Sequence, residues 1–305
     1  MIVYCDLHRP PVFRDMFAES GVVQQNHYRS IFAMLLERRY PGKFVPDSWL
    51  YPAFEKMKKE DTVIVFDSYT TRRYLRRLCE TFPDKRIILW FWNPVKDPAW
   101  LRKIPVQIEQ WTYSRADSTR YGLRYNTQFF FDCLAEEAEA CRKEKQADPP
   151  EFPKALFVGR DKKRAAVLKK WEEALTAAGA AVDLRIVPDP PKKPGILYEE
   201  LITYREIISL VKEADVILDY STDPDAGLSM RPFEAMFFGK KLITNQREIL
   251  QADFYDPANI YLCGQDSRSL KEFLGTPQKP VDAAVRDRYL LSNWLQRFET
   301  EEAGL

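Results

Sequence analysis

Short apolar runs alternate with helix-like stretches through the first half of the chain. Thr62–Phe66 and Arg86–Trp92 are nearly continuous apolar runs, which are typical of strands buried on both faces of a parallel sheet. Ile2–Cys5 is a shorter candidate strand. Residues 26–40 and 71–82 place apolar side chains at helical spacing, and Asn26 suits the N-cap of the first of these helices. The alternation predicts a parallel sheet with right-handed crossovers.

The second half repeats this alternation. Thr203 and Glu206 form a capping box, which marks the start of a helix, and Gly179 closes an earlier helix. The expected strands are 155–158, 182–187, 216–219, 241–244 and 259–263, and the expected helices are 164–178, 203–213, 232–238, a stretch from 246, and 289–298.

Three prolines within five residues, Pro149, Pro150 and Pro153, separate the two halves. Proline opposes helix continuation, so we place a domain boundary here. The expected fold class is α/β, with two Rossmann-like doubly wound parallel-sheet domains at residues 1–148 and 149–305. The last helix, about residues 284–298, is expected to pack back onto the preceding domains. In one interpretation it crosses to the N-terminal domain.

The composition supports two packed domains and excludes several classes of protein. Of 305 residues, 45% are apolar and 30% charged, which excludes wholesale disorder. The formal net charge, 46 − 45 = +1, argues against a protein that coats nucleic acid, and no DNA- or RNA-binding module is recognisable. The charge is divided unevenly, because residues 1–150 carry 24 Lys/Arg against 20 Asp/Glu and residues 151–305 carry 22 against 25.

The cysteines and the N-terminus predict a cytoplasmic protein. Five scattered cysteines without metal-ligand spacing indicate free thiols in a reducing compartment rather than a metal site. The first residues lack the basic and apolar parts of a signal peptide, and no run of about 18 apolar residues is present.

A first candidate site follows the strand at 155–158. Gly159 lets the backbone approach a ligand, and Arg160, Lys163 and Arg164 precede a helix whose N-terminus offers free N–H groups. These features suit a phosphate or diphosphate. A solvated basic turn explains the same residues equally well.

A second candidate site follows the strand at 216–219. Gly227 and Ser229 lie in a small-residue loop, Arg231 adds a forked donor, and Glu234 is placed to accept two adjacent hydroxyls, as on a ribose. The alternative for Glu234 is a favourable interaction with the helix dipole. Asp223-Pro224-Asp225 has the spacing of a metal motif, but a proline between the acids favours a turn.

The block Gly227–Thr244, which reads GLSMRPFEAMFFGKKLIT, resembles the donor-binding domain of GT-B glycosyltransferases. It is most similar to the bacterial lipopolysaccharide, capsule and spore-maturation-glycosyltransferase-like group. Phe91–Pro94 and Tyr121–Asn126 also resemble this group, so the similarity covers most of the chain.

The resemblance implies two domains facing a cleft, a nucleotide-sugar donor on the second domain, an acceptor on the first, and no metal or cofactor. It places Arg160 and Lys163 on the diphosphate, Glu234 on ribose or sugar hydroxyls, and Ser229, Met230 and Arg231 along the phosphate loop. Many retaining members carry a second Glu eight residues before the Glu-Ala pair, and Ala226 stands there in this chain.

The first domain offers candidates for the catalytic base of such a transferase. An inverting transfer needs a base within hydrogen-bond reach of the acceptor hydroxyl. His27 and Asp67 are the candidates, with His8 a third, and His8 and Asn93 are expected on the acceptor side. Each has a plainer interpretation, as a surface residue or, for Asp67, as a helix cap.

Basic residues beside apolar ones in the first domain suit an anionic membrane surface. Arg72, Arg73, Arg76 and Arg77 share a helix with Tyr74, Leu75 and Leu78, and Arg38, Arg39 and Lys43 follow Phe32, Leu35 and Leu36. An ordinary solvated helix face is the alternative. The hypothesis is a peripheral contact with the inner leaflet, where a lipid-linked acceptor is found.

The function expected from these observations is sugar transfer from a nucleotide-sugar to a glycan or lipid-linked acceptor in bacterial surface polysaccharide or lipopolysaccharide assembly. The alternatives are a non-catalytic scaffold of the same fold and a sugar-nucleotide epimerase.

Overall fold

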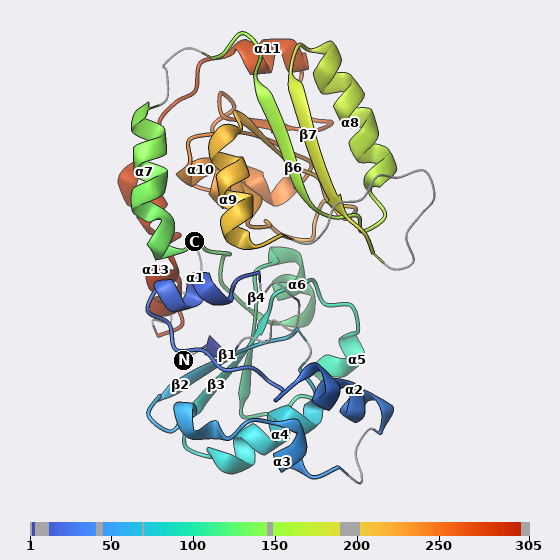
Figure 1. Ribbon diagram of the computed structural model, residues 1–305, viewed down its shortest axis with the longest axis vertical. Coiled ribbons are helices and arrows are strands. Elements are labelled where there is room, and N and C mark those ends of the chain that lie inside the picture. The colour runs from blue at the N-terminus through green and yellow to red at the C-terminus, as the bar shows by residue number, and fades with distance from the viewer. Residues whose placement is uncertain are drawn as a thin grey trace. The chain divides into compact units, whose positions relative to one another are not determined.

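The computed structural model describes residues 2–3, 12–40, 45–68, 70–144, 149–189 and 202–299. The chain forms two compact units, one up to Asn126 and one from Thr127 onward (Figure 1). Each unit contains a five-stranded parallel sheet with helices packed on it. This confirms the expected α/β fold class with two parallel-sheet units.

The first sheet has the strand order β1-β2-β3-β4-β5, and all pairs are parallel. Its strands are β1 (Ile2–Val3), β2 (Thr62–Phe66), β3 (Arg86–Phe91), β4 (Ile108–Thr112) and β5 (Arg124–Tyr125). Gln24 forms an isolated parallel bridge with Ile2. Strand β1 therefore has Gln24 as its neighbour on one side and β2 as its neighbour on the other. Because the chain visits Gln24 first and β2 second, the direction of winding reverses at β1.

Helices cover both faces of this sheet. They are α1 (Arg14–Glu19), α2 (Ile31–Arg39), α3 (Asp47–Leu50), η1 (Phe54–Met57), α4 (Arg72–Thr81), α5 (Pro98–Leu101) and α6 (Arg115–Tyr121). Leu75 of α4 packs with Val63 and Val65 of β2 in the main core. On the opposite face, Phe17 of α1 packs edge-on against Phe66, with ring centroids 5.9 Å apart.

Helix α2 begins later than the sequence pattern suggested. Ser30 is its N-cap, and the Ser30 Oγ accepts a hydrogen bond of 3.1 Å from the Ala33 N–H. The prediction of Asn26 as the cap is therefore wrong. A serine closer to the first apolar turn performs the same function, satisfying one of the free N–H groups of the helix. Thr71 caps α4 in the same way.

The second sheet has the order β10-β9-β8-β6-β7, again fully parallel. Its strands are β6 (Lys154–Arg160), β7 (Ala181–Val187), β8 (Val216–Asp219), β9 (Lys241–Thr244) and β10 (Ile260–Leu262). The chain runs from β6 outward to β7 and then returns to β8 on the other side of β6. This reversal creates a topological switch point between β6 and β8, which is where doubly wound sheets bind ligands.

Among the described residues, the elements that connect and follow these strands are α8 (Ala165–Ala177), α9 (Tyr204–Glu213), α10 (Arg231–Phe237), η3 (Arg247–Gln251) and α11 (Leu270–Gly275). Leu168 and Phe273, from α8 and α11, belong to a core cluster with Phe157 of β6. The capping box at Thr203 and Glu206 is confirmed. The helix expected from residue 246 is only the short 3₁₀ turn η3.

The end of the chain packs on the segment that opens the second unit. This segment contains η2 (Asp132–Leu134) and α7 (Ala135–Glu144), and the chain closes with α12 (Ala283–Asp287) and α13 (Leu291–Gln296). The Leu291 N–H donates to the Phe130 carbonyl at 2.8 Å, and the Trp294 indole donates to the Thr127 carbonyl at 2.7 Å.

The contacts therefore divide the chain between Asn126 and Thr127, before the boundary expected at residue 148. Prolines prevent helix continuation, but they do not decide which core the preceding helix joins. Here α7 joins the second unit, where it contacts α10. No helix among the described residues is long and apolar enough to cross a membrane.

Candidate anion-binding site

A buried carboxylate organises the carboxyl end of β8. Asp219 is only 1% exposed, and its Oδ1 accepts hydrogen bonds of 3.0 Å from both Ser229 Oγ and Arg231 Nη1. Its Oδ2 accepts from Gln246 Nε2 at 3.1 Å and from Thr244 Oγ1 at 3.3 Å. A buried charge is tolerated when donors surround it in this way. Asp219 thereby holds the loop after β8 and the end of β9 together.

Arg231 links this carboxylate to the neighbouring strand. Besides its ion pair with Asp219, it donates from Nε and Nη2 to the Val158 carbonyl of β6, at 3.2 and 2.7 Å. The planar fork of arginine allows this two-sided contact, and a lysine would make only part of it. The predicted residue Arg231 therefore lies at the switch point between β6 and β8.

Arg164 lies beside Arg231 at the same point. Its Nε and Nη2 donate to the Arg160 carbonyl at 3.1 and 2.9 Å, and its Nη1 donates to the Tyr220 carbonyl. The guanidinium carbons of Arg164 and Arg231 lie 4.7 and 4.9 Å from the centroid of the Phe157 ring. Burial, and then repulsion from Arg231, lower the pKa of Arg164 to about 9. These two guanidinium groups, one of them ion-paired with Asp219, place positive charge beside the end of β6.

Gly159 is required by these arginines. A Cβ added at this position would overlap Arg231 Nη2 and would lie 3.0 Å from Arg164 Nη2. The sequence-based reason for Gly159 was close approach of a ligand to the backbone. That role stays a prediction, and the structure shows that the glycine leaves room for the two guanidinium groups. Gly227, in the loop after β8, has a φ of 92°, a conformation that favours glycine.

The outer part of the first loop carries two basic side chains. Arg160 is half-buried and Lys163 is exposed, and neither side chain has a hydrogen bond or ion pair with another described residue. The Asp161 carboxylate caps α8, because Oδ1 accepts from the Ala165 N–H at 2.9 Å. The first N–H of α8 is thus already occupied, so the Arg160 and Lys163 side chains are better placed than the helix N-terminus to contact an anion.

Glu234 lies deeper than its expected role suggests. It is 4% exposed, and its Oε1 accepts a 2.9 Å hydrogen bond from the Tyr204 hydroxyl. Burial raises the pKa of Glu234, while Arg231 opposes the rise. Its partner here is a protein hydroxyl, so the role toward ribose or sugar hydroxyls stays a prediction. Met230, the N-cap of α10, accepts the Glu234 N–H through its carbonyl at 3.0 Å.

The acidic pair in the loop after β8 forms a turn. Asp223 Oδ1 accepts from the Asp225 N–H at 3.1 Å, and Asp225 forms an exposed ion pair with Arg247 at 3.0 Å. This agrees with the turn that the intervening proline indicated.

In the first unit, Asp67 and Asn93 come together at the carboxyl ends of β2 and β3. Asp67 Oδ1 accepts from the Trp92 N–H at 2.9 Å, and the Asn93 side chain also hydrogen-bonds to the carboxyl group. Burial raises the pKa of Asp67 to about 7 against these opposing hydrogen bonds. A carboxyl with such a pKa can exchange a proton near neutral pH.

His27 occupies a closed environment. It is fully buried, its Nε2 lies 3.3 Å from Thr70 Oγ1, and its ring packs on Tyr74 with centroids 4.9 Å apart. Burial lowers the pKa of His27 to about 3, so the imidazole is neutral. His27 is completely buried whereas Asp67 is partly exposed, so the geometry favours Asp67 over His27 as the base. His8 lies outside the described residues.

Sequence reasoning missed Asp219, Gln246, Thr244 and Tyr204. Asp219 was visible as a lone acid at the end of an apolar strand, which was the one available signal. Its importance depends on donors from Ser229, Arg231 and Gln246, which only the folded sheet brings together.

Comparison with solved structures shows a shared fold at low sequence identity. The crystal structure of an α,α-trehalose-phosphate synthase (UDP-forming) from Burkholderia xenovorans, in complex with glucose-6-phosphate, is 14% identical with a TM-score of 0.51. The match covers 94% of this chain and 84% of that chain. This likeness agrees with the GT-B architecture of two parallel-sheet units.

Two further structures match less well. The apo lipopolysaccharide outer core galactosyltransferase WaaB is 16% identical with a TM-score of 0.47, over 92% of this chain and 83% of that chain. The N-terminal domain of Candida albicans trehalose-6-phosphate phosphatase is 13% identical with a TM-score of 0.47, over 81% and 70%. No protein-family model and no curated protein matches the sequence.

Proposed function

We propose that the protein is a glycosyltransferase that moves a sugar from a nucleotide-sugar donor to a glycan or lipid-linked acceptor. One observation carries the proposal. Arg160, Lys163 and the Arg164–Arg231 pair lie at the carboxyl ends of β6 and β8, on either side of the switch point. Ligands of doubly wound sheets bind at this place, and the residues there suit a diphosphate.

In the proposed donor complex, Arg160 and Lys163 contact the diphosphate. Arg164 and Arg231 contribute positive charge without contacting it, from their place over the Phe157 ring. Arginine and lysine side chains neutralise the leaving group, so the proposed transfer needs no metal or cofactor. Gly227, Ser229 and Met230 form the loop that faces the phosphates. To bind the hydroxyls of the ribose or sugar, Glu234 would replace its hydrogen bond from the Tyr204 hydroxyl by bonds from the donor.

The proposed transfer uses Asp67 as the base. The acceptor hydroxyl oxygen bonds to the anomeric carbon of the sugar, and Asp67 takes the hydroxyl proton. The bond between the sugar and the diphosphate breaks, and its electrons leave with the nucleoside diphosphate. A pKa of Asp67 near 7 leaves the carboxylate ready to accept this proton at neutral pH.

Thermal denaturation with a panel of nucleoside diphosphates and sugar nucleotides tests the donor site. We expect nucleotides with one particular nucleobase to raise the Tm of the protein. The double variant Arg160→Ala/Lys163→Ala should abolish this rise without changing the Tm of the free protein. Lys169→Ala/Lys170→Ala, on the exposed face of α8, is the matched control. An equal rise in both double variants contradicts the site. Hydrolysis of the same sugar nucleotide distinguishes an enzyme from a scaffold, and a changed free sugar without acceptor indicates an epimerase.

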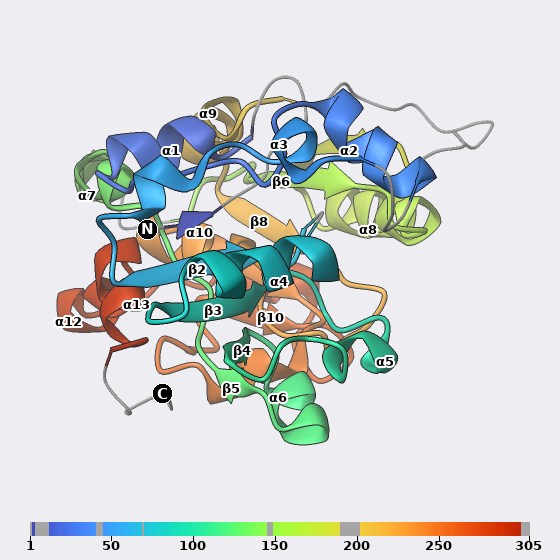
Figure 2. The same ribbon diagram turned by 90° about the horizontal axis from the view of Figure 1, so that it is seen from below.

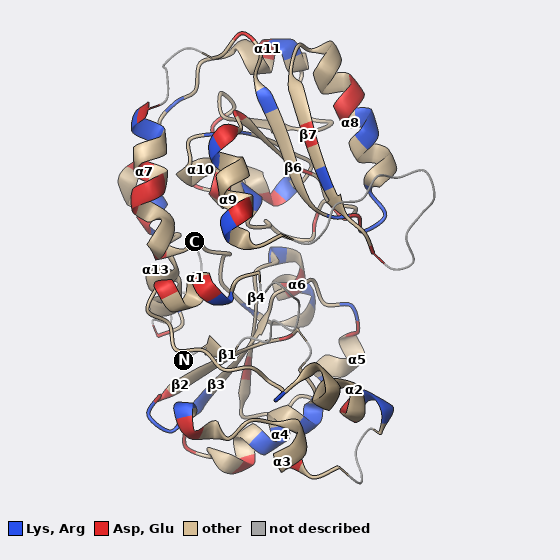
Figure 3. Ribbon diagram, viewed as in Figure 1, with Lys and Arg blue, Asp and Glu red and all other residues tan. Residues whose placement is uncertain are grey.

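The proposed setting is bacterial surface polysaccharide or lipopolysaccharide assembly at the cytoplasmic face of the inner membrane. Helices α2 and α3 pack against one another (Figure 2) and expose apolar side chains, with Phe32 71% and Trp49 66% exposed. We call Ile31, Phe32, Leu35, Tyr40 and Trp49 the α2 patch. Arg38 and Arg39 lie at the end of α2 (Figure 3). Aromatic side chains beside arginines suit an anionic lipid surface.

Helix α4 does not take part in this patch, contrary to the sequence-based hypothesis. Tyr74, Leu75 and Leu78 are buried in the core, and Arg73 and Arg77 form ion pairs with Asp47 at 2.5 and 2.7 Å. Co-sedimentation with phosphatidylglycerol vesicles tests the α2 patch. Phe32→Ser/Trp49→Ser is expected to abolish binding, while Val106→Ser, at another exposed apolar residue, leaves it unchanged. Equal sedimentation of both variants rules out the α2 patch.

A further inference from the structure

A pocket of about 440 Å³ lies at the amino-terminal ends of β8, β9 and β10, within the second unit. Asp215 and Val216, Lys240–Leu242, and Asn259 and Ile260 contribute these strand ends to its lining. The candidate anion-binding site lies at the carboxyl ends of the strands of the same sheet. The pocket is therefore a separate feature, on the opposite edge of the sheet.

The pocket explains a part of the sequence block that the donor site does not use. Gly239, Lys240 and Lys241 precede and open β9, so they lie at the edge away from Asp219 and Arg231. Gly239 has a φ of 62°, and a Cβ there would lie 3.0 Å from Arg142 Cγ. The glycine thus lets the Arg142 side chain pack against the turn at the border of the pocket.

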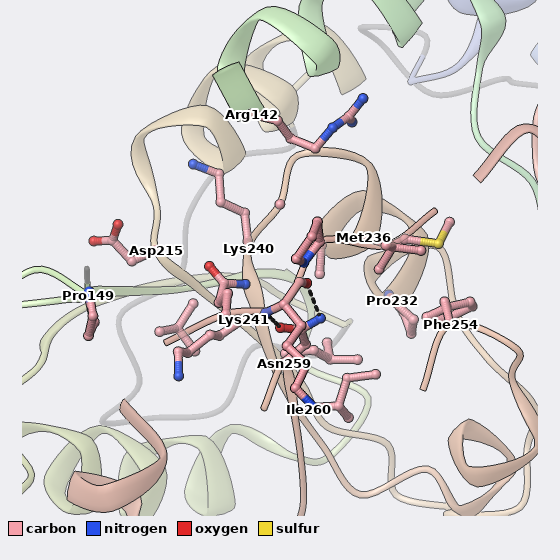
Figure 4. A pocket seen from close by; sticks show the side chains of 18 of the residues that line it. Arg142, Pro149, Asp215, Pro232, Met236, Lys240, Lys241, Phe254, Asn259 and Ile260 are labelled. Atoms are coloured by element: carbon pink, nitrogen blue, oxygen red, sulfur yellow. Dashed lines mark hydrogen bonds between the residues drawn. The ribbon is translucent and has the colours of Figure 1, made fainter. Parts of the chain in front are cut away.

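The two sides of the pocket differ in chemistry. Figure 4 shows Pro232, Met236 and Phe254 grouped on one side, and Lys240 and Asp215 on the other. Ile260, Leu274 and Val281 add further apolar surface to the lining. Such a division suits a molecule with an apolar body and a polar head, because each part meets a matching surface.

Cations outnumber carboxylates around the pocket. Six Lys or Arg side chains line it against two carboxylates: Arg142, Lys143, Lys240, Lys241, Lys279 and Arg286 against Glu139 and Asp215. Outside the lining, Asp256 forms a 3.2 Å ion pair with Lys279. Asp282 and Asp287 also act on Arg286 from outside the lining, and with all three outer acids counted 6 − 5 leaves an excess of one positive charge.

Two of these cations share one acid. Arg142 donates to Glu139 Oε2, and Arg286 Nη2 lies 3.6 Å from the same oxygen. Burial, and then repulsion from Arg142, lower the pKa of Arg286. A second anion near this pair relieves the repulsion between the guanidinium groups.

We propose that this pocket binds a small amphiphilic anion, with its apolar body against Met236 and Phe254 and its anionic head toward Arg142 and Arg286. The shared chemistry is an alkyl or ring body with one phosphate or carboxylate. This ligand is neither the donor nor the acceptor of the proposed transfer, so the inference goes beyond that function. It assigns a second ligand site to the second unit.

Isothermal titration calorimetry of the full chain tests the proposal with defined probes. Decyl phosphate and decanoate, each below its micelle-forming concentration, represent the two head groups, and decyl glucoside is the neutral control. We expect one anion per chain, and at least about tenfold weaker binding of the glucoside. Absence of anion binding, or equal affinity for the glucoside, overturns the proposal.

Variants at exposed or half-buried lining residues locate the site without disturbing the core. The double variant Lys143→Glu/Lys279→Glu is expected to weaken anion binding about tenfold. Val281→Trp narrows the pocket and is expected to weaken the binding of all three probes. Lys169→Glu/Lys271→Glu, at exposed positions outside the lining, is the matched control and should bind normally. Unchanged affinity in the first two variants overturns the proposal. Displacement of the anion by the nucleotide that raises the Tm also overturns it, because it identifies one shared site.

Discussion

Arg231 donates a hydrogen bond of 3.0 Å from Nη1 to Asp219 Oδ1, and the rest of its fork reaches the Val158 carbonyl on β6. This pair joins the loop after β8 to the strand beside it. The ends of the two strands that flank the switch point are thereby held in one arrangement before any ligand arrives. Such preorganisation lowers the cost of binding an anion.

Arg231→Lys is expected to keep the charge but lose the bonds to Val158. We expect a loss of about 1–3 kcal/mol in the free energy of unfolding, because the half-buried Val158 carbonyl loses its donors. Urea denaturation measures this loss. Arg247→Lys is the control, because its ion pair with Asp225 is exposed, and we expect a change within about 0.5 kcal/mol. Equal small effects in both variants contradict the structural role of Arg231.

Gly159→Ala is expected to force Arg231 and Arg164 away from the end of β6. Crowding in a packed region costs about 1–3 kcal/mol of stability, and nucleotide binding should weaken with it. Gly275→Ala is the matched control, because an added Cβ there meets no atom within 4 Å and its φ is not positive. We expect this control to be neutral or slightly stabilising. Normal stability and nucleotide binding in Gly159→Ala disproves the close packing of this glycine.

The pKa of Asp67 predicts how transfer depends on pH. If Asp67 is the base, kcat/KM rises as pH increases through about 7, where the carboxyl loses its proton. Asp67→Asn should remove this rise together with most of the activity. A pH profile of kcat/KM for the wild-type protein, with substrate identified by the Tm panel, checks the prediction. A profile that is flat between pH 6 and 8 excludes Asp67 as the base.

The same shift affects stability with a defined sign. The folded-state pKa of Asp67 lies above the ordinary value of 3.8, so the native state holds the proton more tightly than the unfolded state. Between pH 3.8 and about 7, this carboxyl therefore makes the protein less stable as pH rises. Asp67→Asn should gain stability relative to the wild type from pH 5 to pH 8. A constant difference between the two proteins in urea denaturation contradicts the shift.

His27 is expected to act in the opposite direction. Its folded-state pKa is about 3 against an ordinary 6.5, so the unfolded state takes up a proton that the buried ring does not. Stability from this group is present above pH 6.5 and is lost as pH falls toward 3.

His27→Gln separates the His27 effect from that of Asp67. The stability advantage of the wild type over this variant should shrink by about 2 kcal/mol between pH 7 and pH 5. Urea denaturation of both proteins at the two pH values measures the change. An advantage that stays constant shows that His27 is not held neutral by burial.

Strands with continuous or alternating apolar residues were predictable, whereas β4, which two adjacent polar residues interrupt, was not. Thr62–Phe66 forms β2 with the expected bounds, because continuous apolar residues need burial on both faces of a sheet. Strand β4 was missed because Glu109 and Gln110 interrupt its apolar pattern. In the sheet, Glu109 forms an ion pair of 2.6 Å with Arg86 of β3, a partner that periodicity along one strand does not reveal.

The loops that carry the candidate site residues were predictable from the sequence. The hydrogen bonds and ring contacts among those residues were not. Arg160, Arg164 and Arg231 were found because glycine and basic residues follow predicted strands, and Arg164 and Arg231 do meet over Phe157. The burial of Glu234 depends on Tyr204, which lies 30 residues earlier in the chain. The amphipathic pattern of α4 did not show whether its apolar side chains are buried or exposed. Leu75 and Leu78 pack in the core, whose position the sequence alone does not specify.

The packing of α13 on residues 127–134 has a practical consequence for isolating the second unit. Phe129, Phe131 and Trp294 form adjoining ring contacts, and the Trp294 indole donates to Thr127. A fragment that started at the proline-rich stretch would leave the buried face of Trp294 in water. A stand-alone fragment for titrating nucleotides and amphiphiles therefore begins at Thr127 and retains the chain through Phe298.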